Sequence, residues 1–302
     1  MCIFCAPPSL SSLLSSPLAP SERIWPRRRG FLLASSAALA LPLLPAAALA
    51  QVDVGDASRL RQLVPAGTLE GAATQQYSQM LTQARAKKAL APDNHPQLLR
   101  LRAIAQRLVP FATQWNPRAR DWRWEINLIG SPQINAFCMP GGKIAFYTGI
   151  LDQLKLSDDE AAMVMGHEMA HALREHARAQ MAKSQATNIG LRLGAQLLGW
   201  GELGNAAASL GGQLLSLKFS RGDESDADLV GLELAARAGY DPQAAVSLWQ
   251  KMGQATGGKQ GLAFLSTHPS GPARIRELQD NVPKVHSLYL AARQGAPLPY
   301  QK

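Results

Sequence analysis

The chain has 302 residues, of which 46% are hydrophobic, and carries a formal net charge of +9 at neutral pH. Without its first 50 residues, which hold four Arg and one Glu, it keeps 27 basic and 21 acidic residues, a net charge of +6. No stripe of basic and aromatic residues accompanies this modest excess, so we expect no nucleic-acid partner.

The first 50 residues have the pattern of an export signal. Three arginines at 27–29 precede an uncharged run over 30–50, which ends in an A-x-A-type cleavage site. We therefore expect a signal peptide over residues 1–50, cleaved after Ala50, and a mature protein in the periplasm. The paired arginines resemble a twin-arginine signal; the general secretory route and an uncleaved anchor are the alternatives.

Helices and then a small sheet are expected in the next part of the chain. Residues 51–118 form an N-terminal helical segment in this prediction, with the clearest helical apolar spacing between Leu98 and Val109. Residues 122–128 alternate between large apolar and polar side chains, which predicts a strand with one buried face. Two short strands around 134–138 and 143–147 follow, joined by a Pro-Gly-Gly turn.

An H-E-x-x-H sequence, His167-Glu168-Met169-Ala170-His171, lies in a segment with the signals of a helix. Ser157 and Glu160 form a capping box, and no Gly or Pro interrupts residues 167–181, so we expect the helix to continue there. Residues four apart share a helix face, so both imidazoles can bind one cation with Glu168 at its open side. The alternative is two ordinary helix histidines and a solvated glutamate.

The segment 186–217 is rich in Gly, Ala and Leu, with Arg192 and Glu202 as its only charged residues. These charges divide it into pieces too short for a standard membrane span. We expect buried or lid-like helices over a cleft, with peripheral membrane contact by this segment as the alternative.

A second acidic helix start follows at Ser220, and Gly239 is expected to end that helix. Glu224 is a candidate third metal ligand, because two neutral imidazoles and one carboxylate leave a cation with an open fourth position. Asp228, one turn further, can accept a hydrogen bond from a ligand imidazole. The alternative is a solvated acidic cluster at a helix N-terminus.

These motifs together resemble the zinc metalloendopeptidases that include HtpX, the CAAX prenyl protease, BepA and LoiP. The S-R-x-x-E-x-x-A-D sequence at 220–228 follows the H-E-x-x-H sequence by about fifty residues, as it does in that family. Further matches are N-A-F-x-x-P-G-G at 135–142, T-G-I-L at 148–151, and T-H-P at 267–269 with Arg274-Ile275. His176 resembles a histidine that follows the motif in BepA-like members. The resemblance covers roughly residues 95 to 282.

The resemblance implies a fold and a set of site residues. The fold is α+β and mostly helical, a zincin of the minigluzincin type with a small β-sheet beside the H-E-x-x-H helix. His167, His171 and Glu224 would bind one zinc ion and Glu168 would be the general base. His268 would be an autoinhibitory fourth ligand; the alternative is that it packs the turn before a proline.

Two further assignments concern the substrate. In zincin-type proteases an edge strand pairs with the extended substrate, and our candidate consists of Asn135, Ala136, Phe137 and Cys138. A structural hairpin without substrate contact is the alternative. The residue that stabilises the oxyanion stays open among Tyr147, Tyr240, Arg221 and His268.

The sequence therefore predicts a catalytic domain over 119–282 with a C-terminal tail over 283–302. We expect a periplasmic zinc metalloendopeptidase. From the resemblance, its substrates are misfolded or misassembled envelope proteins, and the outer-membrane assembly machinery is a candidate partner. A chaperone-like assembly factor with little proteolysis and a zinc hydrolase acting on cell-wall peptides are the competing functions.

Overall fold

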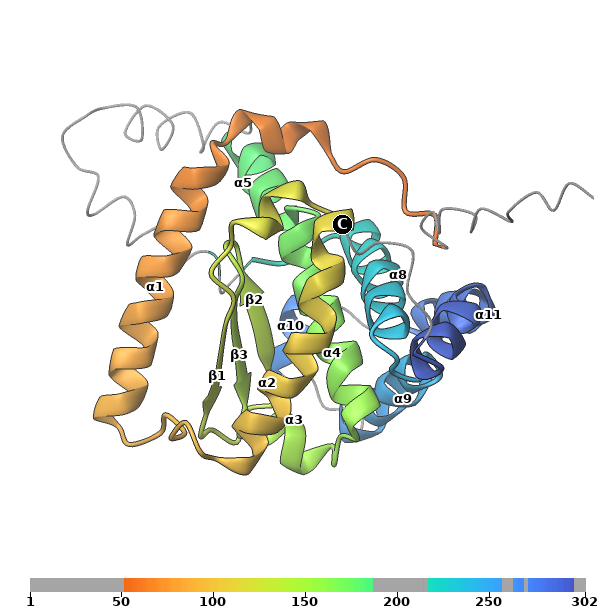
Figure 1. The fold of residues 1–302 in the computed structure, drawn as a ribbon. Coiled ribbons are helices and arrows are strands. Elements are labelled where there is room, and N and C mark those ends of the chain that lie inside the picture. The colour runs from red at the N-terminus through yellow and green to blue at the C-terminus, as the bar shows by residue number, and fades with distance from the viewer. Residues whose placement is uncertain (1–51, 187–213, 215–216, 257–262, 269–270, 296–302) are drawn as a thin grey trace, which may run out of the picture. The chain divides into compact units, whose positions relative to one another are not determined.

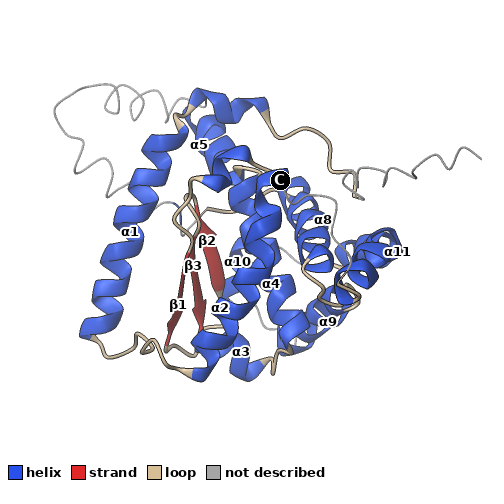
Figure 2. Cartoon of the chain, in the orientation of Figure 1, coloured by secondary structure: helices blue, strands red, loops and turns tan. Residues whose placement is uncertain are grey.

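The computed structural model describes residues 52–186, 214, 217–256, 263–268 and 271–295, all within one unit that covers Pro45–Lys302. The described part is mostly helical and holds a three-stranded sheet (Figure 1, Figure 2), which confirms the predicted α+β class. Its helices are α1 (Ala66–Ala86), α2 (Pro96–Leu108), α3 (Thr148–Gln153), α4 (Asp158–Leu173), α5 (His176–Ala186), α8 (Arg221–Arg237), α9 (Ala244–Thr256), α10 (Ala263–Thr267) and α11 (Pro272–Arg293), with 3-10 turns at Arg59–Leu63, Val109–Gln114 and Pro117–Arg120.

The sheet has the strand order β1-β3-β2, which leaves β2 at one edge. β1 (Glu125–Ile129) runs parallel to β3 (Lys143–Tyr147), and β2 (Ala136–Met139) runs antiparallel to β3. The hairpin turns at Gly141 and Gly142, whose φ angles of 86° and 78° suit glycine. The two strands predicted around 134–138 and 143–147 are thus confirmed.

The strand predicted over 122–128 does not include its first three residues, and its polar face, which was expected to be exposed, is covered. Trp122 and Trp124 pack on each other 5.4 Å apart, and the indole of Trp124 donates to the carbonyl of Ala119, so residues 122–124 are irregular and β1 begins after them. The polar face of β1 is covered by α1, where the Tyr77 hydroxyl accepts a hydrogen bond from the amide of Asn127 (3.1 Å). The sheet therefore lies between α1 on one face and α2 with α4 on the other.

The H-E-x-x-H helix is shorter than the sequence predicts. α4 begins with the expected capping box at Ser157, but it ends at Leu173. Glu175 has a φ of 57°, and its carboxylate pairs with Arg61 (3.0 Å) and Arg178 (2.6 Å), so the chain turns here without Gly or Pro. This turn starts α5 with His176 beside α4.

α4 and α8 cross with their backbones in contact. A Cβ atom added to Gly231 on α8 would lie 2.6 Å from the backbone nitrogen of His167, and one added to Gly166 would lie 2.8 Å from the carbonyl oxygen of Gly231. Only glycine at both positions allows this approach. α8 begins with a capping box at Ser220 and ends before Gly239, as the sequence predicts.

The expected boundary between a catalytic domain ending at 282 and a tail from 283 falls inside a helix. α11 continues to Arg293, and Val285 and Leu288 are buried in the same core as α4 and α8. Pro283 lies within α11, and a proline is ordinarily a sign of a helix end. α2, from the segment expected over 51–118, belongs to this core as well.

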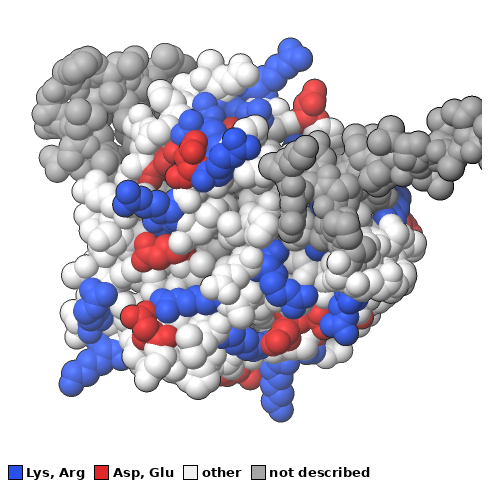
Figure 3. All heavy atoms as spheres, viewed as in Figure 1, with Lys and Arg blue, Asp and Glu red and all other residues white. Residues whose placement is uncertain are grey.

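Two predicted segments lie outside the described residues: the signal peptide over 1–50 and nearly all of 186–217. Among the described segments, none of the helices has both the length and the apolar composition needed to cross a bilayer. On the face shown in Figure 3, basic and acidic side chains are interspersed.

Candidate metal centre

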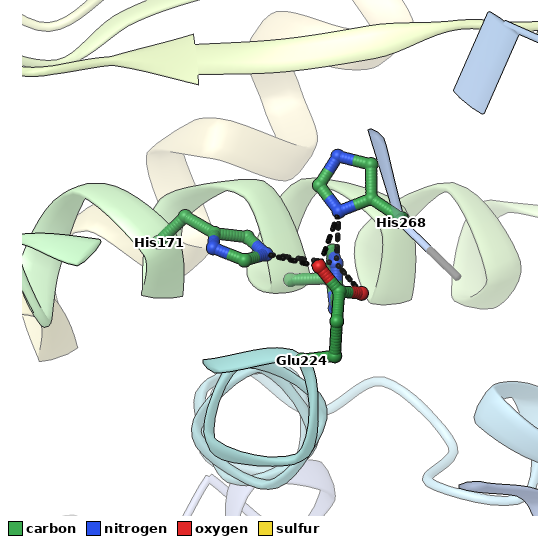
Figure 4. Close-up of side chains that lie close together, drawn as sticks. His171, Glu224 and His268 are labelled. Carbon is green, nitrogen blue, oxygen red and sulfur yellow. Dashed lines mark hydrogen bonds and ion pairs between the residues drawn. The ribbon is translucent and has the colours of Figure 1, made fainter. Parts of the chain in front are cut away.

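Four buried side chains from three parts of the chain converge on one point. His167 and His171 come from α4, Glu224 from the first turn of α8, and His268 from the residue after α10. One ligand atom from each lies within 4.8 Å of all the others. Figure 4 shows His171 and Glu224 pointing toward one another from their helices, with His268 closing the group.

Most of the distances between these atoms are close to those expected around a small metal ion. The Nε2 atom of His167 lies 3.2 Å from Nε2 of His171 and 3.2 Å from Nδ1 of His268. Oxygens of Glu224 lie 2.9 Å from His268, 3.5 Å from His171 and 3.7 Å from His167. Metal–nitrogen bonds of about 2.0–2.1 Å in a tetrahedron place neighbouring ligand atoms about 3.3–3.4 Å apart.

The outward-facing nitrogens of the two motif histidines support the same assignment. Nδ1 of His167 lies 3.0 Å from a carboxylate oxygen of Asp228, so this nitrogen carries the proton and donates. Nδ1 of His171 lies 3.0 Å from Nδ1 of His176. Burial, and then the nearby His167 and His176, lower the pKa of His171 well below its ordinary value. Neutral imidazoles with lone pairs facing one another are the donor set that a cation needs.

Glu168 lies beside this cluster on the cleft side. Its Oε1 atom is 3.6 Å from Nε2 of His268 and has no hydrogen-bond partner among the described residues. Burial is the main cause that raises the pKa of Glu168, and the Glu224 carboxylate adds to it, while His268 and His167 act in the opposite direction. A buried carboxylate with a raised pKa is a suitable acceptor for a proton near neutral pH.

A cleft in front of Glu168 is lined by the edge strand. In the antiparallel β2–β3 pair, the N–H of Tyr147 donates to the carbonyl of Asn135. Hydrogen-bonded pairs alternate along such a ladder, so Phe137 is bonded to β3 while Ala136 and Cys138 direct their backbone groups to the free edge. The cleft is lined by Asn135, Ala136, Phe137, Cys138, Met139, Pro140, Glu168, His171, Ala172, Ala177, Leu214, Leu217, Phe219, Thr267 and His268.

Comparison with known proteins identifies the family. A family model described as peptidase family M48 matches residues 96–282. The chain belongs to peptidase family M48. The match confirms the resemblance seen in the motifs, and it covers the sheet, all of the cluster and the crossing of α4 with α8.

Curated relatives of the chain come from fungi, plants, animals and bacteria. The chain is 36% identical over 198 residues to the mitochondrial metalloendopeptidase OMA1 of Schizosaccharomyces pombe, a match that covers 65% of the chain and 56% of that protein. It is 28% identical to the metalloprotease LoiP of Escherichia coli over 200 residues, 65% of the chain and 75% of LoiP. The beta-barrel assembly-enhancing protease of Yersinia pestis is 29% identical over 163 residues, 51% of the chain and 33% of that protein. The chain thus spans about half the length of the OMA1 protein.

The M48 site contains one of the four predicted oxyanion candidates. His268 belongs to the cluster. Tyr147 packs on Phe137, with ring centroids 6.4 Å apart, on the sheet face that α1 covers. The ring of Tyr240 lies 4.0 Å from the guanidinium carbon of Arg107, and Arg221 is exposed at the start of α8.

Three residues that surround the cluster of His167, His171, Glu224 and His268 are absent from the site predicted by sequence. Arg274 bonds Asp228 and reaches Glu224 Oε2 at 2.7 Å. His176 contacts His171, and Asp226 accepts from His176 (3.0 Å). Arg274 and His176 both lie in segments that match the motifs of the family, and this position could have indicated that they belong near the site. Their hydrogen-bond partners depend on how α5 and α11 pack. The sequence does not distinguish Asp226 and Asp228 from the other acidic residues at the start of α8, so it does not predict which of them is the partner.

Proposed function

We propose that this chain is a zinc-dependent metalloendopeptidase. The observation that carries the proposal is the buried group of His167, His171, Glu224 and His268, with the buried carboxylate of Glu168 next to it. His167, His171 and Glu224 would hold the ion. Bound there, zinc supplies Lewis-acid chemistry, by lowering the pKa of a water molecule and polarising a peptide carbonyl.

Glu168 is the proton carrier in this proposal. Its carboxylate takes a proton from the attacking water and later gives it to the leaving amine. One oxygen of Glu168 has no hydrogen-bond partner among the described residues, so it can accept a proton from water without losing an existing bond. Burial raises the pKa of this carboxylate, which makes it a stronger base than an exposed glutamate.

The free edge of β2 is our proposed substrate-binding strand. Ala136 and Cys138 present backbone groups to the cleft in which Glu168 lies. An extended peptide that pairs with this edge is held by backbone hydrogen bonds, which accept many side chains. The N–H of Ala136 is bonded to the side chain of Asn135 (3.0 Å), so a substrate carbonyl would replace that oxygen.

His268 is proposed as an autoinhibitory ligand. Its Nδ1 atom lies 3.2 Å from Nε2 of His167 and 2.9 Å from Glu224, so it would take the fourth ligand position, which a water molecule needs for hydrolysis. The ring of Phe264 stacks on that of His268 (4.5 Å), and the His268 N–H donates to the carbonyl of Phe264. A rotation that withdraws this side chain would free that position for water.

The proposed substrates are misfolded or misassembled envelope proteins in the periplasm, and outer-membrane assembly is the proposed setting. The predicted export signal and the similarity to the beta-barrel assembly-enhancing protease of Yersinia pestis support this. The S. pombe relative is named as mitochondrial, so the export signal is the main support for the periplasm as the compartment. N-terminal sequencing of exported protein should begin at Gln51, whereas retention of residues 1–50 in the cytoplasm would contradict the assignment.

The proposal is tested by metal content and cleavage together. The purified chain should hold about one zinc ion. Glu168→Gln should keep that zinc and lose cleavage of an unfolded model protein, while Glu224→Ala should lose both. The exposed Asp152→Asn is a matched control and should change neither.

The same variants separate the competing functions. A chaperone-like factor would hold unfolded protein equally well with Gln at position 168, and its wild type would cut little. A Glu168→Gln variant that still cleaves, or a wild type without bound metal, would disprove the proposed enzyme.

A further inference from the structure

The two histidines of the H-E-x-x-H sequence are anchored by hydrogen-bond relays of different length. From His167 the relay is direct: Nδ1 lies 3.0 Å from Asp228, whose carboxylate is held by Arg274 at 2.7 Å. From His171 an additional imidazole intervenes. His171 Nδ1 contacts His176 Nδ1 at 3.0 Å, and His176 Nε2 contacts Asp226 at 3.0 Å. Arg174 then holds Asp226 at 2.7 Å.

The direction of the longer relay follows from the tautomers. If Nε2 of His171 is a metal ligand, its proton is on Nδ1, and that N–H must donate. Nδ1 of His176 is then the acceptor, which places the proton of His176 on Nε2. That N–H donates to Asp226, which as a carboxylate only accepts. Every atom of the relay thereby has the role that its neighbours require.

We propose that His176 is a positioning residue, which orients and polarises the metal ligand His171 through this relay. The inference rests on the proposed function, because it requires His171 to bind a metal ion. His176 is buried and does not itself belong to the ligand group. The turn at Arg174 and Glu175 is what returns the chain so that His176 meets His171, five residues earlier.

The far end of the relay is fixed by a remote segment. The Nη2 atom of Arg174 donates to the carbonyls of Val54 (3.3 Å) and Gly55 (2.8 Å). Two residues earlier, the N–H of Val52 donates to the buried carboxylate of Glu233 on α8 (3.1 Å). Arg174 therefore cannot swing away from Asp226 while residues 52–55 are docked. Outer partners of this kind typically change metal affinity by about 10- to 100-fold.

The experiment compares two substitutions at one position in the full chain. In His176→Asn the amide oxygen lies near the former Nδ1 and still accepts from His171. In His176→Leu that acceptor is lost but the volume is kept. Zinc affinity is measured by competition with a chromogenic chelator, and urea unfolding of the metal-free proteins measures stability. The exposed His286→Leu on α11 is the control and should match wild type.

We expect His176→Leu to bind zinc about 10- to 100-fold more weakly, with His176→Asn near wild type and all metal-free proteins similarly stable. Equal affinity of the Leu variant and wild type, or equal loss in both variants, would overturn the proposal. If the Leu variant does not fold, Asp226→Asn tests the next link, and its unchanged affinity would overturn the proposal too. A wild type that takes up no zinc would disprove the proposed function and this inference together.

Discussion

Arg274 donates two hydrogen bonds of 2.7 Å to the carboxylate of Asp228, from Nε to Oδ2 and from Nη2 to Oδ1. Its guanidinium carbon also lies 3.8 Å from the ring centroid of Trp249, and Nη1 reaches Glu224 at 2.7 Å. One cation from α11 thus sets the orientation of two carboxylates on α8. A planar fork is needed for this geometry, so lysine is a poor replacement.

The first prediction concerns this buried pair. Arg274→Ala leaves two buried carboxylates without their cation and should lower the free energy of unfolding by about 3–5 kcal/mol. Arg274→Lys should recover only part of that loss. Urea unfolding measures both, with the exposed Arg276→Ala on the same helix expected to stay within about 0.5 kcal/mol of wild type. A small effect of Arg274→Ala would show that Asp228 is satisfied in another way.

The second prediction separates two roles of His268. If this side chain blocks the fourth position, His268→Ala should raise the basal cleavage rate of an unfolded protein several-fold while zinc content stays unchanged. If it instead stabilises the oxyanion, the same variant should cut about 10²–10³ times more slowly. Initial rates at equal zinc loading decide between them, and His286→Ala serves as the surface control.

The third prediction is a pH dependence of stability at Glu160. Burial would raise the pKa of Glu160, but hydrogen bonds from Lys251, the Ser157 N–H and Ser247 outweigh it and lower the pKa from 4.5. The folded pKa is therefore below the unfolded one, so the stabilisation is present above about pH 4.5 and is lost as the pH falls through the folded value. Glu160→Gln should cost about 1 kcal/mol at pH 7. That difference should vanish in acid, and a constant difference down to pH 3 would contradict the assignment.

The fourth prediction concerns the crossing of α4 with α8. In Gly231→Ala the new methyl group would lie 2.6 Å from the backbone nitrogen of His167, so the helices must separate. We expect a loss of about 1–3 kcal/mol in stability, together with weaker zinc binding, because Glu224 moves away from both histidines. At Gly253 on α9 the added Cβ would meet no atom within 4 Å among the described residues outside its own helix turn, so Gly253→Ala should instead stabilise the protein by about 0.5–1 kcal/mol.

The local signals in the sequence predict the elements of the site well. The capping boxes at Ser157 and Ser220 give the starts of α4 and α8, because such motifs act within four residues. The Pro-Gly-Gly turn gives the β2–β3 hairpin for the same reason. Each of these features depends only on neighbours along the chain.

What the sequence predicts poorly depends on distant contacts. The end of α4 at Leu173 requires Arg61, more than one hundred residues earlier, to pair with Glu175. The alternating pattern of β1 predicts an exposed polar face, but in the folded chain α1 covers that face. The contacts of His176 with His171 and of Arg274 with Asp228 likewise form only once α5 and α11 pack against α4 and α8.

The free edge of β2 also affects how copies of this protein behave toward one another. An open strand edge is a template for uncontrolled pairing between molecules, and its danger grows with its length. β2 spans only Ala136–Met139, ends at Pro140, and has the N–H of Ala136 covered by the side chain of Asn135. The short length of this edge and the proline that ends it therefore make it a weak template for pairing between copies, while it stays open toward the cleft.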